Sequence, residues 1–148
     1  MCLGLASCGG GGSGSGGGTG AGGTLSKSQL ISQGDAICQR GSDKTDALGK
    51  TPSDAAGIKA YFDKLTGILN GTLADLRELK PPSDLAADYN SMLAVIESVI
   101  SDSEKIGVAA SAGDGAKMTQ VATHLEKVVS QGGVLAKRIG FKGACAEG

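Results

Sequence analysis

Apolar side chains recur every three or four positions from residue 24 to the end of the chain. This spacing is typical of amphipathic helices, and no stretch with the alternating pattern of a strand competes with it. The pattern predicts four helices, over residues 26–48, 54–79, 84–112 and 116–139. Because the links between the second, third and fourth are short, these helices should be antiparallel neighbours. We therefore predict an all-α fold, an antiparallel four-helix bundle.

Capping and breaking residues set the expected ends of these helices. We place Ser53 as the N-cap of the second helix and Ser83 or Asp84 as the N-cap of the third. The prolines at 81–82 end the second helix, because proline lacks an amide proton and clashes with the preceding turn. Gly140 is a suitable C-cap for the fourth helix.

Glycines interrupt two of the predicted helices. Gly34 and Gly41 each weaken the first helix by up to about 1 kcal/mol relative to alanine. The pair Gly132-Gly133 in the fourth helix indicates a kink or a place where another helix approaches closely. The core should be aliphatic, because aromatic residues make up only 3% of the chain and tryptophan is absent.

The charge pattern argues against nucleic-acid binding. The formal net charge is −1, and the two signs are interleaved along the chain rather than clustered. The chain has a short basic cluster, Lys137, Arg138 and Lys142. We interpret it as positive charge that complements the negative C-terminal end of a helix dipole. We therefore expect no nucleic-acid partner.

The segment Leu5-Ala6-Ser7-Cys8-Gly9 resembles a bacterial lipobox, in which an apolar residue and two small residues precede a cysteine. In that motif the cysteine receives a diacylglycerol thioether and becomes the new N-terminus. The resemblance implies lipidation at Cys8 and a lipid-anchored location on the extracytoplasmic face of the cell membrane. A signal peptide starts with basic residues and has a longer apolar run, so we expect the true start to lie upstream of Met1.

Residues 9–23 form a low-complexity segment in which eleven of the fifteen residues are glycine. Glycine loses the most backbone freedom on ordering, so this segment should be a flexible tether with an end-to-end distance of roughly 20 Å. The expected organisation is the end of a signal peptide with the lipobox over 1–8, the tether over 9–23 and a helical domain over 24–148.

The four cysteines leave one pair for a disulfide if Cys2 is cleaved away and Cys8 carries lipid. Exported proteins retain disulfides, and a tail folded back from the fourth helix could reach Cys38. We therefore predict a Cys38–Cys145 disulfide that ties the C-terminal tail to the bundle; the alternative is two buried free thiols. Two cysteines and the single His124 do not make a tetrahedral ligand set, so no metal is expected.

Four short runs are similar to a group of small exported helical proteins and lipoproteins of actinobacteria, in which D-A-I-C near the start and a cysteine near the end bracket the domain. The runs are KSQLI at 27–31, GDAIC at 34–38, LRELKPP at 76–82 and IGFK at 139–142. The resemblance covers most of residues 26–145. It implies an exported location, this architecture and the disulfide, and it brings no active site with it.

The single histidine opens the run His124-Leu125-Glu126-Lys127, which resembles the start of a histidine phosphotransfer motif. Those motifs place glycine after the lysine, where this chain has Val128, so we expect an ordinary helical histidine at the edge of an apolar stripe. The run Gly49-Lys50-Thr51 matches the end of a phosphate-binding loop. No strand precedes it, and we interpret it as an interhelical loop.

Carboxylates on the second and third helices are interpreted as solvated faces; they are Asp75, Glu78, Glu97, Asp102 and Glu104. We therefore expect no catalytic residues and no cofactor. The sequence favours a non-enzymatic binding or envelope-associated lipoprotein, with a protein, an envelope polymer or a small apolar ligand as its partner. The alternatives are an envelope enzyme with a dispersed site and a phosphotransfer-like bundle that uses His124.

Overall fold

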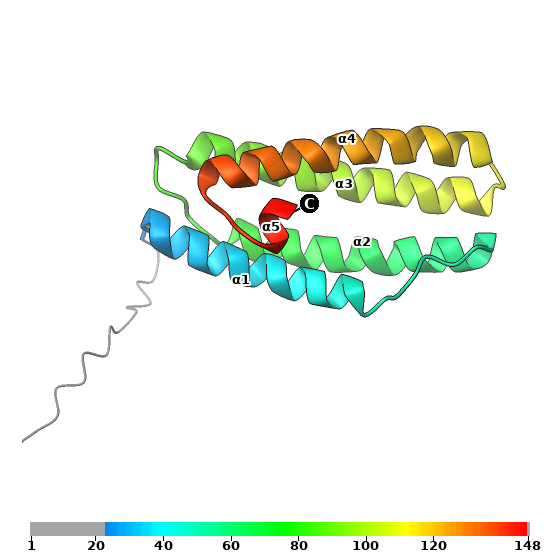
Figure 1. Cartoon of the computed structure of the whole chain (residues 1–148), viewed down its shortest axis with the longest axis horizontal. Coiled ribbons are helices and arrows are strands. Elements are labelled where there is room, and N and C mark those ends of the chain that lie inside the picture. Colours follow the sequence, from blue (N-terminus) through cyan, green and yellow to red (C-terminus); the bar gives the residue numbers. More distant parts are fainter. Residues whose placement is uncertain (1–22, 148) are drawn as a thin grey trace, which may run out of the picture.

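The computed structural model describes residues 23–147, which fold into a helical bundle (Figure 1). Four long helices and one short helix follow in the order α1 (Lys27–Asp46), α2 (Ala55–Arg77), α3 (Ala86–Ser111), α4 (Gly115–Ile139) and α5 (Ala144–Glu147). The predicted all-α four-helix bundle is confirmed. The one-turn helix α5 lies in the tail, where the sequence has no helical period.

Successive long helices run in opposite directions, so the predicted antiparallel order is confirmed (Figure 1). α2 packs against α1 and α3, and α3 packs against α4. The short helix α5 lies between α1 and α4 and contacts both. Over part of its length, the gap between the first and last long helices is therefore filled by the returning tail.

The helix ends follow the expected capping chemistry, with one shift. The N-cap of α2 is Asp54 rather than Ser53, because the Asp54 carboxylate accepts a hydrogen bond from the Gly57 amide at 2.8 Å. Gly140 caps α4 as predicted. It has a left-handed φ of 108°, and its amide donates to the Ala136 carbonyl.

The predicted N-cap of α3 is wrong. Neither Ser83 nor Asp84 caps the helix, which begins after Leu85 without a side-chain cap. The Leu85 amide donates to the Pro82 carbonyl at 3.0 Å, so the chain completes a turn before the helix starts. Because this turn includes the residues that were predicted to cap the helix, α3 begins further along the chain than predicted.

The start of α1 is fixed to the same end of the bundle as the α2–α3 link. The Leu25 amide donates to the Lys80 carbonyl at 2.8 Å. A capping box follows, in which Ser26 and Gln29 each accept a hydrogen bond from the backbone amide of the other. The described chain therefore enters the fold at the α2–α3 end.

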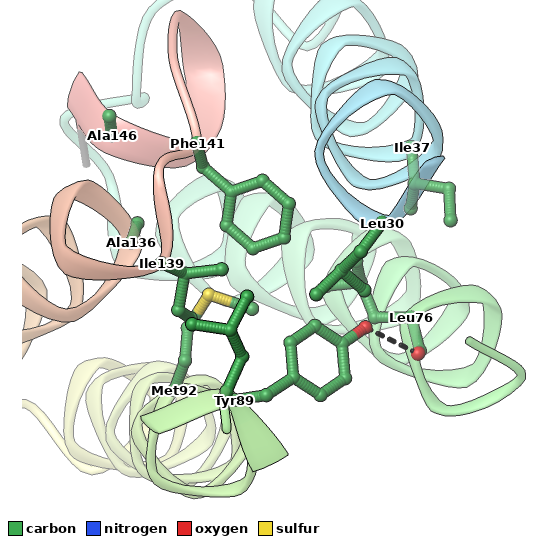
Figure 2. Packing of buried hydrophobic residues seen from close by; sticks show 10 residues of the cluster. Leu30, Ile37, Leu76, Tyr89, Met92, Ala136, Ile139, Phe141 and Ala146 are labelled. Atoms are coloured by element: carbon green, nitrogen blue, oxygen red, sulfur yellow. Dashed lines mark hydrogen bonds between the residues drawn. The ribbon is translucent and has the colours of Figure 1, made fainter. Parts of the chain in front are cut away.

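The main cluster of buried hydrophobic residues lies at this same end (Figure 2). The buried Tyr89 hydroxyl donates to the Leu76 carbonyl at 2.6 Å, which ties α3 to the last turn of α2. Burial raises the pKa of Tyr89 to about 12. The core is aliphatic as predicted, except that the rings of Tyr89 and Phe141 lie within it.

The two glycines that weaken α1 are both contact points. A Cβ atom on Gly34 would lie 2.3 Å from Cε1 of Phe141, and one on Gly41 would lie 2.7 Å from Oγ1 of Thr72. Both glycines are buried. The helix thus loses intrinsic propensity at the positions where the tail and α2 approach its backbone.

Candidate functional site

The proposed lipidation site, Cys8, lies outside the described residues. So do Cys2 and all but the last residue of the predicted tether. Between residues 23 and 147, no helix is both long and apolar enough to cross a membrane. The structure therefore bears on the helical domain alone.

The tail returns along the bundle as predicted. Cys38 of α1 and Cys145 of α5 form a disulfide whose Cα atoms are 5.2 Å apart, across a sequence separation of 107 residues. A second attachment precedes it, because the Lys142 amide donates to the Asp35 carboxylate at 2.9 Å. The alternative of two free thiols is not what the structure shows.

Helix α5 acts as a wedge between α1 and α4. Phe141 inserts its ring into the core just before α5 begins (Figure 2). On the other side, a Cβ atom on Gly133 would lie 3.1 Å from the Ala146 carbonyl oxygen. Of the two interpretations of Gly132-Gly133, close approach is therefore confirmed. The wedge is held to α1 by a covalent bond and to α4 by backbone contact.

Next to this wedge, the four long helices surround a partly open cleft of about 370 Å³. Its volume falls within the range of small-molecule sites, about 300 to 1,000 Å³. The disulfide and Ala144 form part of its wall. Six of its lining side chains are aliphatic residues that are only partly buried: Ile68, Leu69, Val95, Ile96, Val99 and Val129.

The cleft runs along the bundle axis. α1 and α3 run in the same direction, and they line the cleft from Cys38 to Thr45 and from Met92 to Val99. The Cys38 and Met92 end is closed by the disulfide, α5 and the packed core. The other end, at Thr45 and Val99, lies further from the point where the chain enters the bundle.

The polar side chains in the cleft wall are largely committed to their own helices. The Thr45 hydroxyl donates to the Gly41 carbonyl, and the Thr72 hydroxyl donates to the Ile68 carbonyl, each at 3.1 Å. Among the described residues that line the cleft, none is charged or aromatic. The cleft therefore offers a hydrocarbon surface and lacks the titratable groups that acid–base chemistry needs.

One of the carboxylates was predicted wrongly. Asp102 is not on a solvated face, since its side chain is only 4% exposed at the α3–α4 interface. Its Oδ2 accepts a hydrogen bond from His124 Nδ1 at 2.5 Å, and its Oδ1 accepts one from Lys105 Nζ at 2.9 Å. His124 itself is 62% exposed and hydrogen-bonded, as expected of a helical histidine at the edge of the apolar stripe.

Burial would raise the pKa of the Asp102 carboxyl, but the hydrogen bonds from His124 and Lys105 and the electrostatic interaction with these two groups outweigh it. The pKa of Asp102 is therefore held below its usual value. An ionised carboxylate only accepts hydrogen bonds, so Nδ1 of His124 carries the proton and Nε2 is the ring nitrogen left for another partner. This pair is separate from the cleft wall.

The other four carboxylates lie on exposed faces as predicted. Glu97 pairs with Arg77 across α2 and α3, and Asp75 pairs with Arg40 across α1 and α2 at 3.7 Å. Exposed pairs of this kind contribute about 1 kcal/mol or less to stability.

The remaining motifs do not form sites. The run Gly49-Lys50-Thr51 lies in the link between α1 and α2, where Gly49 has a left-handed φ of 73°, so its interpretation as a loop is confirmed. Over the range that the structure describes, no three side chains of His, Cys, Asp or Glu gather in a way that could hold a metal ion.

Comparison of the chain with protein-family models, with curated proteins and with solved structures finds no match.

Two features of the site were not predicted from the sequence. Asp102 stands three residues after Val99 and four before Ile106, a position on the apolar face of α3, so its place in the helical period could have signalled its burial. The cleft has no such signal, because it depends on how far α5 holds α4 from α1. The aliphatic residues that line it have the spacing of ordinary core positions.

Proposed function

We propose that this chain is a non-enzymatic, lipid-anchored module on the extracytoplasmic face of the membrane, and that its bundle binds a small apolar ligand. The cleft of about 370 Å³ carries the proposal. It is lined by aliphatic side chains that the fold leaves partly exposed. Partly exposed hydrocarbon inside a concave site is the usual property of a binding pocket for apolar molecules.

The proposed anchor is supported by the sequence Leu5-Ala6-Ser7-Cys8-Gly9 and by the glycine-rich segment that follows it. The Cys38–Cys145 disulfide is consistent with an oxidising compartment, where such bonds persist. Membership of the small exported helical lipoproteins of actinobacteria is part of the same proposal.

The binding role is favoured over an enzymatic one because the cleft and the ionisable pair do not coincide. Asp102 and His124 lie at the α3–α4 interface, outside the cleft wall. A catalytic pair needs a site in which a substrate is held beside it. A protein or an envelope polymer would also leave the cleft without a role, so a small apolar ligand is the preferred partner.

Two measurements test the proposal. Mass spectrometry of the native protein from membranes should find diacylglycerol on an N-terminal Cys8; an unmodified Cys8 with an intact N-terminus would contradict the anchor. For the ligand, methyl NMR of the purified chain should show saturable shifts at Val95 and Val99 with at least one of three apolar probes: octanoate, adamantane carboxylate or indole. The absence of shifts with all three would contradict the binding role.

A second candidate rests on His124. The buried Asp102 carboxylate orients the exposed ring through Nδ1 and leaves Nε2 available, which suits a phosphoryl acceptor on a four-helix bundle. The motif departs from the phosphotransfer pattern at Val128. Incubation with acetyl phosphate and phosphorus NMR tests it: a phosphoramidate signal that disappears in His124→Gln would support this candidate, and the absence of a signal would remove it.

A further inference from the structure

From the shape and chemistry of the cleft, we infer that its ligand is a single unbranched hydrocarbon chain of about ten carbons, such as that of a medium-chain fatty acid. This inference rests on the proposed binding function and specifies its ligand class. The polar head would lie toward Ser42 and Thr45, at the end of the cleft away from the disulfide.

The length of the cleft sets the length of the chain. On α1 the lining runs from Cys38 to Thr45, and on α3 from Met92 to Val99, which is about 10 Å along each helix axis. A volume of about 370 Å³ spread over this length leaves a cross-section of roughly 35 Å², which is wider than one extended hydrocarbon chain but too narrow for two side by side. A methylene group occupies about as much space as a water molecule, near 30 Å³, so the cleft holds on the order of ten carbons.

The wall chemistry favours a saturated hydrocarbon over aromatic rings and charged groups. Because Thr45 and Thr72 donate to carbonyls of their own helices, their hydroxyls need no partner from a ligand. No aromatic ring is available for stacking among the lining residues that the structure describes. The remaining attraction is dispersion contact with aliphatic side chains, and a flexible chain makes many such contacts by bending to follow the cleft wall.

Because one end of the cleft is closed, the ligand can place only one hydrocarbon tail in it. Met92 is buried there, and α5 is fixed by its bond to Cys38. A diacyl lipid has two longer tails, and the cleft is too small for both. We therefore favour a free single-chain amphiphile over a lipid that stays in a bilayer.

A chain-length series tests this inference. Straight-chain fatty acids from six to fourteen carbons would be titrated below their micelle concentrations, with Kd measured from methyl shifts at Val95 and Val99. Kd should fall about three- to fourfold for each added methylene, as expected for burial of hydrocarbon, and then level off near ten carbons. A Kd that is independent of length, or that keeps falling through fourteen carbons, would overturn the inference.

A matched pair of variants locates the site. Val99 lines the cleft and Val108 is 67% exposed elsewhere on the same helix. Val99→Trp should weaken decanoate binding at least tenfold, while Val108→Trp should leave it unchanged. Equal effects would contradict the location. If Val99→Trp does not fold, Val129→Phe on α4 serves the same purpose, and folding is checked by circular dichroism.

Two further probes separate this inference from the proposed function. Adamantane carboxylate has ten carbons in a compact cage and the same head group as decanoate. If the cage binds as tightly as decanoate or more tightly, the unbranched chain is wrong but an apolar-ligand function stands. If neither binds, this inference fails, and the proposed function fails with it when octanoate and indole also cause no shifts. Phosphatidylcholine vesicles should not shift the methyl signals of Val95 and Val99. If they do so as strongly as decanoate, the ligand is a bilayer lipid and the inference fails.

Discussion

The ring of Phe141 occupies the space beside Gly34 that a side chain would otherwise fill. A Cβ atom at Gly34 would lie 2.3 Å from Cε1 and 2.7 Å from Cζ of this ring. The tail is thus held to α1 by the close packing of Phe141 against Gly34 as well as by the disulfide. This packing places an aromatic ring in an otherwise largely aliphatic core.

Replacement of Gly34 by alanine should destabilise the protein. The new methyl group would displace the buried Phe141 ring, at a cost of about 1 to 3 kcal/mol in the free energy of unfolding. Gly67→Ala is the matched control, since this α2 glycine has open space around it and should gain up to about 1 kcal/mol in helix propensity. Chemical denaturation measures both, and a stabilising Gly34→Ala would show that the ring contact is not tight.

Removal of the disulfide should lower stability by about 4 kcal/mol, because a long loop is no longer closed in the unfolded chain. Cys38→Ala, Cys145→Ala and the double variant should all lose the same amount. Guanidinium denaturation with and without reductant is the measurement. Reductant should destabilise the parent protein and leave the variants unaffected; an equal response in all four would argue against the bond.

The Asp102–His124 pair should make stability depend on acid pH. Folding lowers the pKa of Asp102 from its ordinary value of 3.8, so the stabilisation is present above that value and is lost as the pH falls through the native pKa. Asp102→Asn should cost about 1 to 2 kcal/mol near neutral pH. The cost should shrink between about pH 5 and pH 2.

Asp75→Asn is the control for this experiment. Asp75 is exposed and its contact with Arg40 is long, so the change should be below about 0.5 kcal/mol at any pH. A cost of Asp102→Asn that stays constant down to pH 2 would mean that the ionised carboxylate does not carry the effect.

The buried Tyr89 hydroxyl should make the protein sensitive to alkali. Burial raises the pKa of Tyr89 to about 12, so folding favours the protonated form. This contribution is complete below the ordinary pKa of 10.0 and is lost as the pH rises from there through the native value. Tyr89→Phe should cost about 1 kcal/mol near neutral pH through the lost bond to Leu76.

Alkaline denaturation curves check this prediction. The stability difference between the parent and Tyr89→Phe should decrease above about pH 10. Tyr61→Phe, on a half-buried ring, is the matched control and should follow the parent curve. If the parent and Tyr89→Phe lose stability equally with pH, the hydroxyl is not the group responsible.

The helical period was enough to predict the four long helices, since three-four spacing reports local structure directly. The N-caps were less predictable. Asp54 and Ser53 are both good capping residues, and only the register of the first turn of α2 decides between them. Cys38 and Cys145 could be paired from the sequence because few alternatives remained.

The parts that the sequence did not predict depend on contacts between distant segments. Helix α5 has one turn and no period of its own, and its place is set by the disulfide and by the gap beside Gly133. The burial of Asp102 depends on the register of α3 against α4, which brings His124 to it. The cleft is a property of all five helices together.

The hydrogen bond between Leu25 and Lys80 determines which end of the cleft lies nearer to the entering chain. It fixes the start of the bundle at the α2–α3 end, and the closed floor of the cleft, at Cys38 and Met92, is the part nearer to that end. A segment joined to the bundle through residue 23 therefore attaches nearer to the floor of the cleft than to its mouth. The open end of the cleft thus lies on the side of the bundle away from the point where the chain enters it.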